Sequence, residues 1–218
     1  MASTPDKSPQ DHWQSVYRTK AADSVSWFRP RLDMSLKLLR QAGLNASSSI
    51  LDAGGGASTL VDDLLEAGLH EITVLDLSSQ ALETARQRIG PGAEVVHWLT
   101  GDLLLAEFPQ DRFDFWHDRA VLHFLHGDDA RLYAQRAAHA VVAGGHAVIG
   151  CFAPEGPERC SGLPVTRRSA GDIAALMTPA FRLVTEEIEQ HRTPGETAQP
   201  FVYALLQRVD DAGAGFDP

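Results

Sequence analysis

The chain has 218 residues, of which 44% are hydrophobic and 22% are charged, and its formal net charge is −10. These values fit one globular domain with a full core. No apolar run approaches the roughly 18 residues that cross a bilayer, and the first ten residues lack the apolar centre of a signal peptide. Nucleic-acid backbones select basic surfaces, so the acidic balance argues against such a partner. We therefore expect a cytoplasmic protein that binds neither nucleic acid nor a membrane.

Residues that commonly hold metals are few and poorly spaced. The two cysteines, Cys151 and Cys160, do not form a CxxC pair, which argues against a disulfide framework and a structural zinc site. His117, His123 and His126 match no common ligand spacing. We therefore predict no bound metal.

The predicted elements, in chain order, are two leading helices followed by alternating strands and helices. Apolar residues at helical spacing, with glycines and serines at the ends, predict helices over residues 11–17, 32–42, 57–67, 80–89, 129–142 and 169–177. Short apolar runs predict strands over residues 50–53, 71–78, 94–100, 112–118, 146–153, 181–192 and 200–209. Gly144 and Gly145 are expected to form the turn before the fifth strand, and the last two strands a hairpin.

This alternation predicts an α/β fold with a Rossmann-like, doubly wound and mostly parallel sheet. Ligands of such sheets bind at the carboxyl ends of the strands, near the point where the strand order reverses. We expect N-terminal cap helices at residues 1–45, the main domain at 46–209 and a flexible tail at 210–218.

A run of three glycines directly follows the first strand. Asp52 and Ala53 end that strand, and Gly54, Gly55 and Gly56 lead toward the next helix. Glycine lets the backbone turn tightly and approach a ligand without obstruction by a Cβ atom. The helix that follows offers unpaired N–H groups at its first turn. The loop therefore predicts a ligand-binding turn, although its glycines alone do not distinguish a dinucleotide from another ligand.

Two further acids end the next two strands. Asp76 closes the second strand, where a carboxylate can accept hydrogen bonds from ribose hydroxyls. Asp102 follows the third strand, where its carboxylate can accept a hydrogen bond from the adenine amine and the neighbouring amide of Leu103 is a further candidate contact. Each acid by itself fits a solvated strand end or a helix cap equally well. Their joint placement after successive strands favours an adenosyl ligand.

The series ILDAGGGAS, VLDLS, GDLLL and FDFWHDRAVLHFL resembles the ordered motifs of class I S-adenosylmethionine-dependent methyltransferases, over about residues 11–208. The resemblance implies a seven-stranded sheet whose last strand is antiparallel. It implies that the first motif lies beneath the methionine portion of the donor, that Asp76 holds the ribose and that Asp102 holds the adenine. The residues it assigns to the cofactor are Asp52, Gly54, Gly56, Asp76 and Asp102. We expect their neighbours Gly55, Leu77, Leu103 and His117 to contact the cofactor as well.

The segment DHWQSVYRTKAADSVSWFRP resembles the cap of a small bacterial subgroup of these enzymes, which closes over the donor. Trp13, Tyr17 and Trp27 are therefore candidates for the donor pocket, because aromatic faces attract the sulfonium cation. Packing of the cap onto the core would explain the same residues.

A nicotinamide-binding domain is the main alternative for the glycine loop. Its fingerprint is GxGxxG/A, and counting from Gly54 the third glycine position falls on Thr59. Asp76 fits both hypotheses, whereas Asp52 and Asp102 favour the methyl donor.

The end of the fourth strand is rich in titratable groups. His117, Asp118, Arg119 and His123 are the candidate catalytic residues, since a base is needed only where the acceptor must lose a proton. Arg119 suits an acidic substrate. Structural roles remain open, with Asp118 and Arg119 as an ion pair and His123 as a core residue. Cys160, in the loop after the fifth strand, is either a pocket residue or a buried structural thiol.

The sequence therefore predicts a methyltransferase that moves a methyl group from S-adenosylmethionine to a nucleophilic atom of a small molecule, leaving S-adenosylhomocysteine. The alternatives are a protein (lysine) methyltransferase and a non-catalytic module that binds the donor and regulates a partner. We expect a monomer or a homodimer.

Overall fold

The computed structural model of the chain describes residues 8–209. The predicted tail at residues 210–218 and the first seven residues of the predicted cap lie outside this part of the chain. The main sheet has seven strands: β1 Ser49–Ala53, β2 Glu71–Asp76, β3 Val96–Thr100, β4 Phe113–Arg119, β5 Val141–Phe152, β8 Phe181–Arg192 and β9 Ala198–Arg208. The α-helices are α1 Pro9–Thr19, α2 Asp33–Gln41, α3 Leu60–Glu66, α4 Ser79–Ile89, α5 Gly127–Ala140 and α6 Ala170–Met177.

The strand order is β3-β2-β1-β4-β5-β9-β8. Strands β1 to β5 pair in parallel, while β9 lies antiparallel between β5 and β8. The predicted doubly wound, mostly parallel sheet with an antiparallel last strand is thus confirmed. The order reverses between β1 and β4, and this switch point opens a crevice at the carboxyl ends of the two strands.

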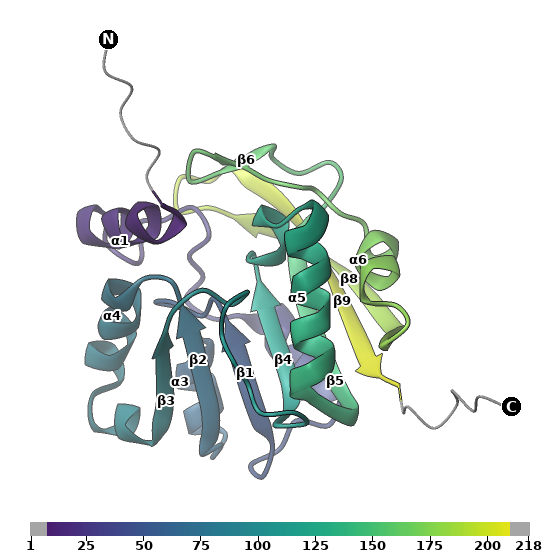
Figure 1. Cartoon of the computed structure of the whole chain (residues 1–218). Coiled ribbons are helices and arrows are strands. Elements are labelled where there is room, and N and C mark those ends of the chain that lie inside the picture. The colour runs from purple at the N-terminus through teal and green to yellow at the C-terminus, as the bar shows by residue number, and fades with distance from the viewer. Residues whose placement is uncertain (1–7, 210–218) are drawn as a thin grey trace, which may run out of the picture.

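Helices cover both faces of the sheet (Figure 1), with α5 and α6 on the front face in that view. Tyr133 of α5 and Ile173 of α6 belong to one buried cluster with Trp116 of β4. On the opposite face, Leu39 of α2 and Leu64 of α3 are fully buried in a second cluster. These two apolar layers fix the strands, and with them the positions of the residues at the strand ends.

The two leading helices lie in different places. Helix α2 buries Leu36, Leu38 and Leu39 against the sheet and so belongs to the packed domain. Helix α1 instead crosses the carboxyl ends of the strands and packs beside α4 (Figure 1). Its first turn is capped by the side chain of Ser8, which accepts a hydrogen bond from the amide of Asp11. Of these two helices, α1 is therefore the one placed to cover a ligand at this edge.

The predicted boundary between the fifth helix and the fifth strand is wrong. Helix α5 ends at Ala140 and β5 begins at Val141, with no separate turn at Gly144 and Gly145. Val141 and Val142 are β-branched and favour a strand. Gly144 takes φ +76°, and the pairing register with β4 shifts between Phe113 and Phe115, so the glycines form an irregularity within the strand. The small hairpin of β6 Arg159–Cys160 and β7 Leu163–Pro164 was also not predicted.

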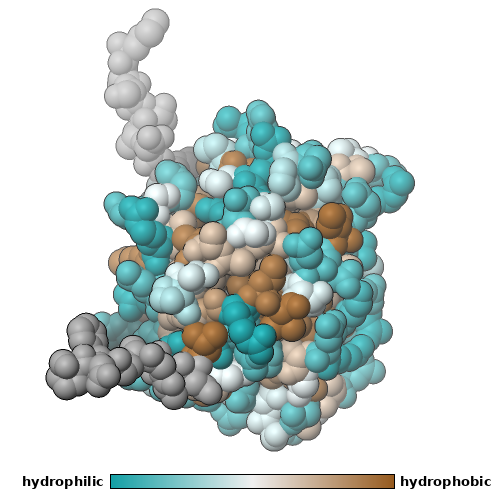
Figure 2. Space-filling model, turned by 90° about the vertical axis from the view of Figure 1, so that its right-hand side faces the viewer, coloured by the Kyte–Doolittle hydropathy of each residue, from teal (hydrophilic) through white to brown (hydrophobic). Residues whose placement is uncertain are grey.

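Strand β8 is one edge of the sheet and exposes Leu183, Val184 and Ile188. Figure 2 views the molecule from this side, where apolar residues gather among hydrophilic ones. Glu186, Glu187 and Glu189 interrupt the apolar run along β8, and charges on an edge strand discourage pairing with another chain. Within residues 8–209, no helix is both long and apolar enough to cross a membrane.

Candidate active site

The acids and glycines singled out in the sequence lie together at the carboxyl edge of the sheet. Asp52 is aligned with His117 on β4, and Asp76 with Thr100 at the end of β3. Parallel strands end at the same edge, so side chains separated by tens of residues in sequence converge here.

The glycine loop has no space for side chains. Gly54 takes φ +72°, and a Cβ atom there would lie 2.0 Å from the Val121 side chain. A Cβ atom on Gly55 would lie 2.4 Å from an oxygen of Asp52, and one on Gly56 would lie 2.9 Å from an oxygen of Asp76. The loop therefore brings backbone into close contact with both carboxylates, as a ligand cradle requires.

Two cavities adjoin this loop. The larger has a volume of about 370 Å³, and the sequence-predicted residues that line it are Trp13, Tyr17, Trp27, Gly54, Asp76, Leu77, Asp102, Leu103 and Arg119. The smaller has about 50 Å³, and the predicted residues around it are Tyr17, Trp27, Asp52, Gly54, Gly55, His117 and Arg119. We call the part bounded by Asp52, Gly54, Asp76 and Asp102 the donor end. Gly56, Asp118 and His123 line neither cavity.

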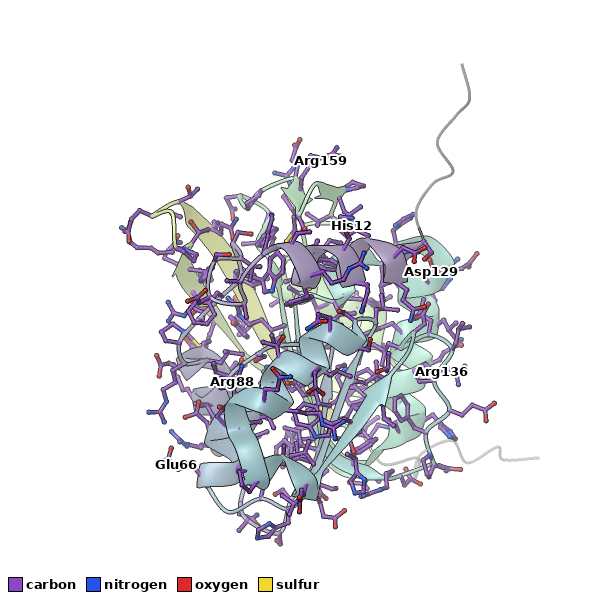
Figure 3. The ribbon with its side chains drawn as sticks, turned by 90° about the vertical axis from the view of Figure 1, so that its left-hand side faces the viewer. His12, Glu66, Arg88, Asp129, Arg136 and Arg159 are labelled. Carbon is purple, nitrogen blue, oxygen red and sulfur yellow. The ribbon has the colours of Figure 1, made fainter. Side chains whose placement is uncertain are left out.

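The remaining walls of the larger cavity come from other segments. We call the part bounded by Trp13, Phe124, Leu125, Cys160, Leu163 and Pro164 the acceptor chamber. Trp13 packs edge to face on Trp27 and on Phe124, with ring centroids 5.6 and 5.2 Å apart. Figure 3 shows α1, labelled at His12, between the hairpin at Arg159 and α4 at Arg88. The cap helix and the hairpin thus form two walls of the chamber.

Asp76 and Asp102 are held by the backbone of their own turns. Asp76 accepts a hydrogen bond of 2.7 Å from the amide of Ser78, and Asp102 one of 2.9 Å from the amide of Leu104. Burial raises the pKa of Asp76 to about 7, and the nearby charge of Asp52 adds to the effect. Ligand hydroxyls that donate hydrogen bonds to such a carboxyl group would stabilise its ionised form.

His117 is fully engaged by protein groups. Its Nδ1 lies 2.7 Å from Oδ1 of Asp52 and its Nε2 lies 2.8 Å from Oγ of Ser35. All three residues are buried. The other oxygen of Asp52, Oδ2, has no hydrogen-bond partner within residues 8–209. A buried carboxylate oxygen without a partner can accept a hydrogen bond from a cationic or N–H group of a ligand.

Asp118 faces away from both cavities, toward α5. It accepts hydrogen bonds from the amides of Val121 and Leu122 and from the hydroxyl of Tyr133, at 2.7, 2.9 and 2.8 Å. Burial raises its pKa to about 6, against the lowering effect of these three donors. Asp118 therefore holds the chain that leads into the acceptor chamber.

His123 is buried between Phe124 and Phe152, with ring centroids 4.4 and 4.7 Å away. Neither ring nitrogen has a hydrogen-bond partner in the described part of the chain. Burial, aided by the charges of Arg119 and Arg168, lowers its pKa to about 3. At neutral pH the ring is therefore uncharged.

Arg119 alone among the four catalytic candidates borders the larger cavity. Its Nε donates to the Tyr203 hydroxyl and its Nη1 to the Trp27 carbonyl, both at 2.9 Å. The guanidinium lies 4.4 Å from the centroid of the Phe201 ring. The carboxylate within ion-pair distance of Arg119 is that of Glu189 and not that of Asp118. The structural ion pair of Asp118 and Arg119, which the sequence left open, is therefore not formed.

Several contributing residues were missed from the sequence. Gln14 of α1 accepts a hydrogen bond of 3.0 Å from the Ser78 hydroxyl at the start of α4, which holds the cap helix in place. Arg168 donates to the carbonyls of Leu122 and Leu125 and so fixes the wall of the chamber. No local pattern reports such contacts, because each joins segments more than 40 residues apart.

The fold and this arrangement of acids and glycines resemble those of class I methyltransferases, which use S-adenosylmethionine as their methyl donor. A sequence model of the family described as "Methyltransferase domain" matches residues 50–145, from β1 into β5. This part of the chain therefore matches the methyltransferase domain family.

Similar proteins were found by sequence and by structure. A mouse eEF1A lysine and N-terminal methyltransferase is 22% identical over 112 residues, which are 51% of this chain; the match spans only 16% of the length of that relative. A structure described as "Conversion of a Disulfide Bond into a Thioacetal Group during Echinomycin Biosynthesis" has a TM-score of 0.74 and 21% identity, over 92% of this chain and 93% of its own. The Burkholderia thailandensis 1,6-didemethyltoxoflavin-N1-methyltransferase has a TM-score of 0.70 and 20% identity, over 96% and 94%. At these identities the structural likeness shows the fold.

Proposed function

We propose that this protein transfers a methyl group from S-adenosylmethionine to a nucleophilic atom of a small molecule, as a cytoplasmic monomer or homodimer. The observation that carries the proposal is the acceptor chamber, which continues from the donor end and has the apolar, aromatic walls typical of small-molecule sites. The neighbouring structure from B. thailandensis, described with bound 1,6-didemethyltoxoflavin and S-adenosylhomocysteine, offers a precedent. The net charge of −10 further disfavours nucleic acid.

The donor end fits S-adenosylmethionine. In this proposal Asp76 accepts hydrogen bonds from the ribose hydroxyls and Asp102 contacts the adenine amine. The unpartnered Oδ2 of Asp52 receives the α-ammonium group, and Gly54 lets the backbone pass close to the methionine portion. The donor supplies a methyl carbon that its sulfonium already activates, so the chain needs chiefly to orient the acceptor and exclude water.

The geometry supports positioning roles for three of the four catalytic candidates. His117 orients Asp52, and Asp118 anchors residues 121 and 122. His123 is uncharged and walled off by aromatic rings, which fits packing behind the chamber. Arg119 remains as the group that can touch an acceptor.

Protein methylation is the second candidate function, and the match to the mouse eEF1A methyltransferase favours it. A peptide lysine would need a channel into the chamber, and α1 and the β6–β7 hairpin form two of the walls that such a channel would pass. A non-catalytic donor-binding module is the third hypothesis, which predicts binding of the donor without turnover.

Transfer of tritiated methyl from S-adenosylmethionine separates these functions. The protein would be incubated with the low-mass fraction and, separately, with the protein fraction of a bacterial lysate. We expect label in an extractable small molecule. Label only in polypeptides would favour the second function, and donor binding without label in either fraction would favour the third.

A further inference from the structure

The walls of the acceptor chamber indicate the shape of the acceptor. Trp13, Phe124, Leu125, Leu163 and Pro164 present apolar or aromatic surface. Aromatic rings in edge-to-face contact, as Trp13 is with Phe124, form rigid walls that suit a flat, apolar molecule. Cys160 adds no charge, because burial raises the pKa of its thiol to about 12.

One buried cation borders this apolar chamber. The Arg119 side chain is 7% exposed, and its Nη2 has no hydrogen-bond partner within residues 8–209. Its nearest acid is Glu189, with 3.8 Å between Nη2 and Oε2. Arg29 lies closer to the same acid, with 3.3 Å between its Nη2 and Oε1. The two guanidinium groups thus share Glu189, but Arg29 also lies 3.9 Å from Oδ2 of Asp33, so it is Arg119 that has no closer carboxylate in the described part of the chain.

A buried guanidinium nitrogen without a hydrogen-bond partner is costly, so Nη2 of Arg119 predicts a ligand that accepts a hydrogen bond there, and an anion does so best. The donor carries one such group, the carboxylate of its methionine portion. Arg29 borders only the small cavity at the glycine loop, whereas Arg119 borders both cavities. The two residues can therefore serve two different anions, with Arg29 on the side of the donor and Arg119 facing the acceptor chamber.

We propose that the acceptor is a small, flat, largely apolar acid whose negative group pairs with Nη2 of Arg119. This rests on the proposed function, because it names the class of molecule that fills the acceptor chamber. Tyr203 and the Trp27 carbonyl hold the other guanidinium nitrogens, so Arg119 is oriented before the acceptor binds. His126 and Asp129, the other titratable groups of the chamber, are exposed at its mouth.

Matched acid and amide probes test the charge directly. Titration calorimetry of the protein saturated with S-adenosylhomocysteine would compare 2-naphthoate with 2-naphthamide, and cinnamate with cinnamamide. Saturation fills the carboxylate subsite of the donor, so the probes report on a second anion site. We expect each acid to bind at least about tenfold more tightly than its amide, as a charge-assisted hydrogen bond implies. Equal affinities would overturn the proposal while leaving a small-molecule acceptor intact.

Variants identify the residue responsible. Arg119→Gln should abolish the preference for the acids, and Arg119→Lys should keep part of it. Arg29→Gln, the matched control, should weaken S-adenosylhomocysteine binding but preserve the preference. If Arg119→Gln instead weakens S-adenosylhomocysteine binding and spares the preference, Arg119 belongs to the donor and the proposal fails. Should Arg119→Gln not fold, the wild-type comparison of acid with amide still decides. Binding of no probe would overturn the proposal of a small, flat acid, whereas the proposed function is tested separately by the transfer of tritiated methyl.

Discussion

The donor end and the acceptor chamber adjoin each other but are built in different ways. The donor end consists of residues that directly follow successive strands, so their relative positions are set by the parallel sheet. The acceptor chamber is assembled from α1, residues 121–125 and the β6–β7 hairpin, none of which is a strand of the main sheet. In the proposed function, a rigid frame therefore holds the donor, while separate segments shape the acceptor site. Substitutions at the two ends should therefore have separable effects.

The largest loss of affinity for S-adenosylhomocysteine is expected from a substitution in the glycine loop. Gly54→Ala places a methyl group 2.0 Å from the Val121 side chain on backbone with φ +72°. We expect this to weaken S-adenosylhomocysteine binding by roughly 2–4 kcal/mol, through strain and displaced packing, as measured by titration calorimetry. Gly144→Ala is the matched control, since it has φ +76° with nothing within 4 Å of its Cβ atom. Similar losses in both variants would mean that backbone strain, not the cradle, is responsible.

Removal of the ribose contact comes next. Asp76→Ala should weaken S-adenosylhomocysteine binding by about 1–3 kcal/mol, because two ribose hydroxyls lose their acceptor. Glu94→Ala, at an exposed acid away from both cavities, should leave affinity unchanged. Unchanged affinity in Asp76→Ala would show that Asp76 does not hold the ribose.

The effect of pH on binding should be smaller than the effect of either substitution. The pKa of Asp76 is raised to about 7, and hydroxyl donors favour the ionised carboxylate over the neutral acid. Affinity for S-adenosylhomocysteine should therefore rise between pH 6 and pH 8, by up to about tenfold. Asp76→Asn, which cannot ionise, should show a flat profile over the same interval. A rise of the same size in Asp76→Asn would assign the titration to another group.

The smallest effect on binding is expected where helix α1 contacts the start of α4. Gln14→Ala removes hydrogen bonds between α1 and the start of α4. We expect S-adenosylhomocysteine to bind about two- to fivefold more weakly, corresponding to roughly 0.5–1 kcal/mol. Phe124→Ala, in the acceptor chamber, should change that affinity less and lower methyl transfer more. The reverse pattern would show that Phe124 belongs to the donor end.

The same contrast explains what could be predicted from the sequence. Asp52, Asp76 and Asp102 were found because a strand followed by an acid is a local pattern and the fold brings the strand ends together. The fit of Asp118 to Tyr133 and of His117 to Ser35 depends on contacts across the sheet, which no local pattern reports. The unpartnered Nη2 of Arg119 likewise depends on how Arg29 and Glu189, which are distant in sequence, lie around it.

The central claim is that the carboxyl edge of this sheet binds S-adenosylmethionine. Calorimetric titration of the purified protein with S-adenosylhomocysteine, and with NAD as a control, tests it most directly. We predict saturable binding at one site for S-adenosylhomocysteine and no binding of NAD. A folded protein that binds NAD instead, or neither compound, would contradict the assignment of Asp52, Asp76 and Asp102 to the methyl donor.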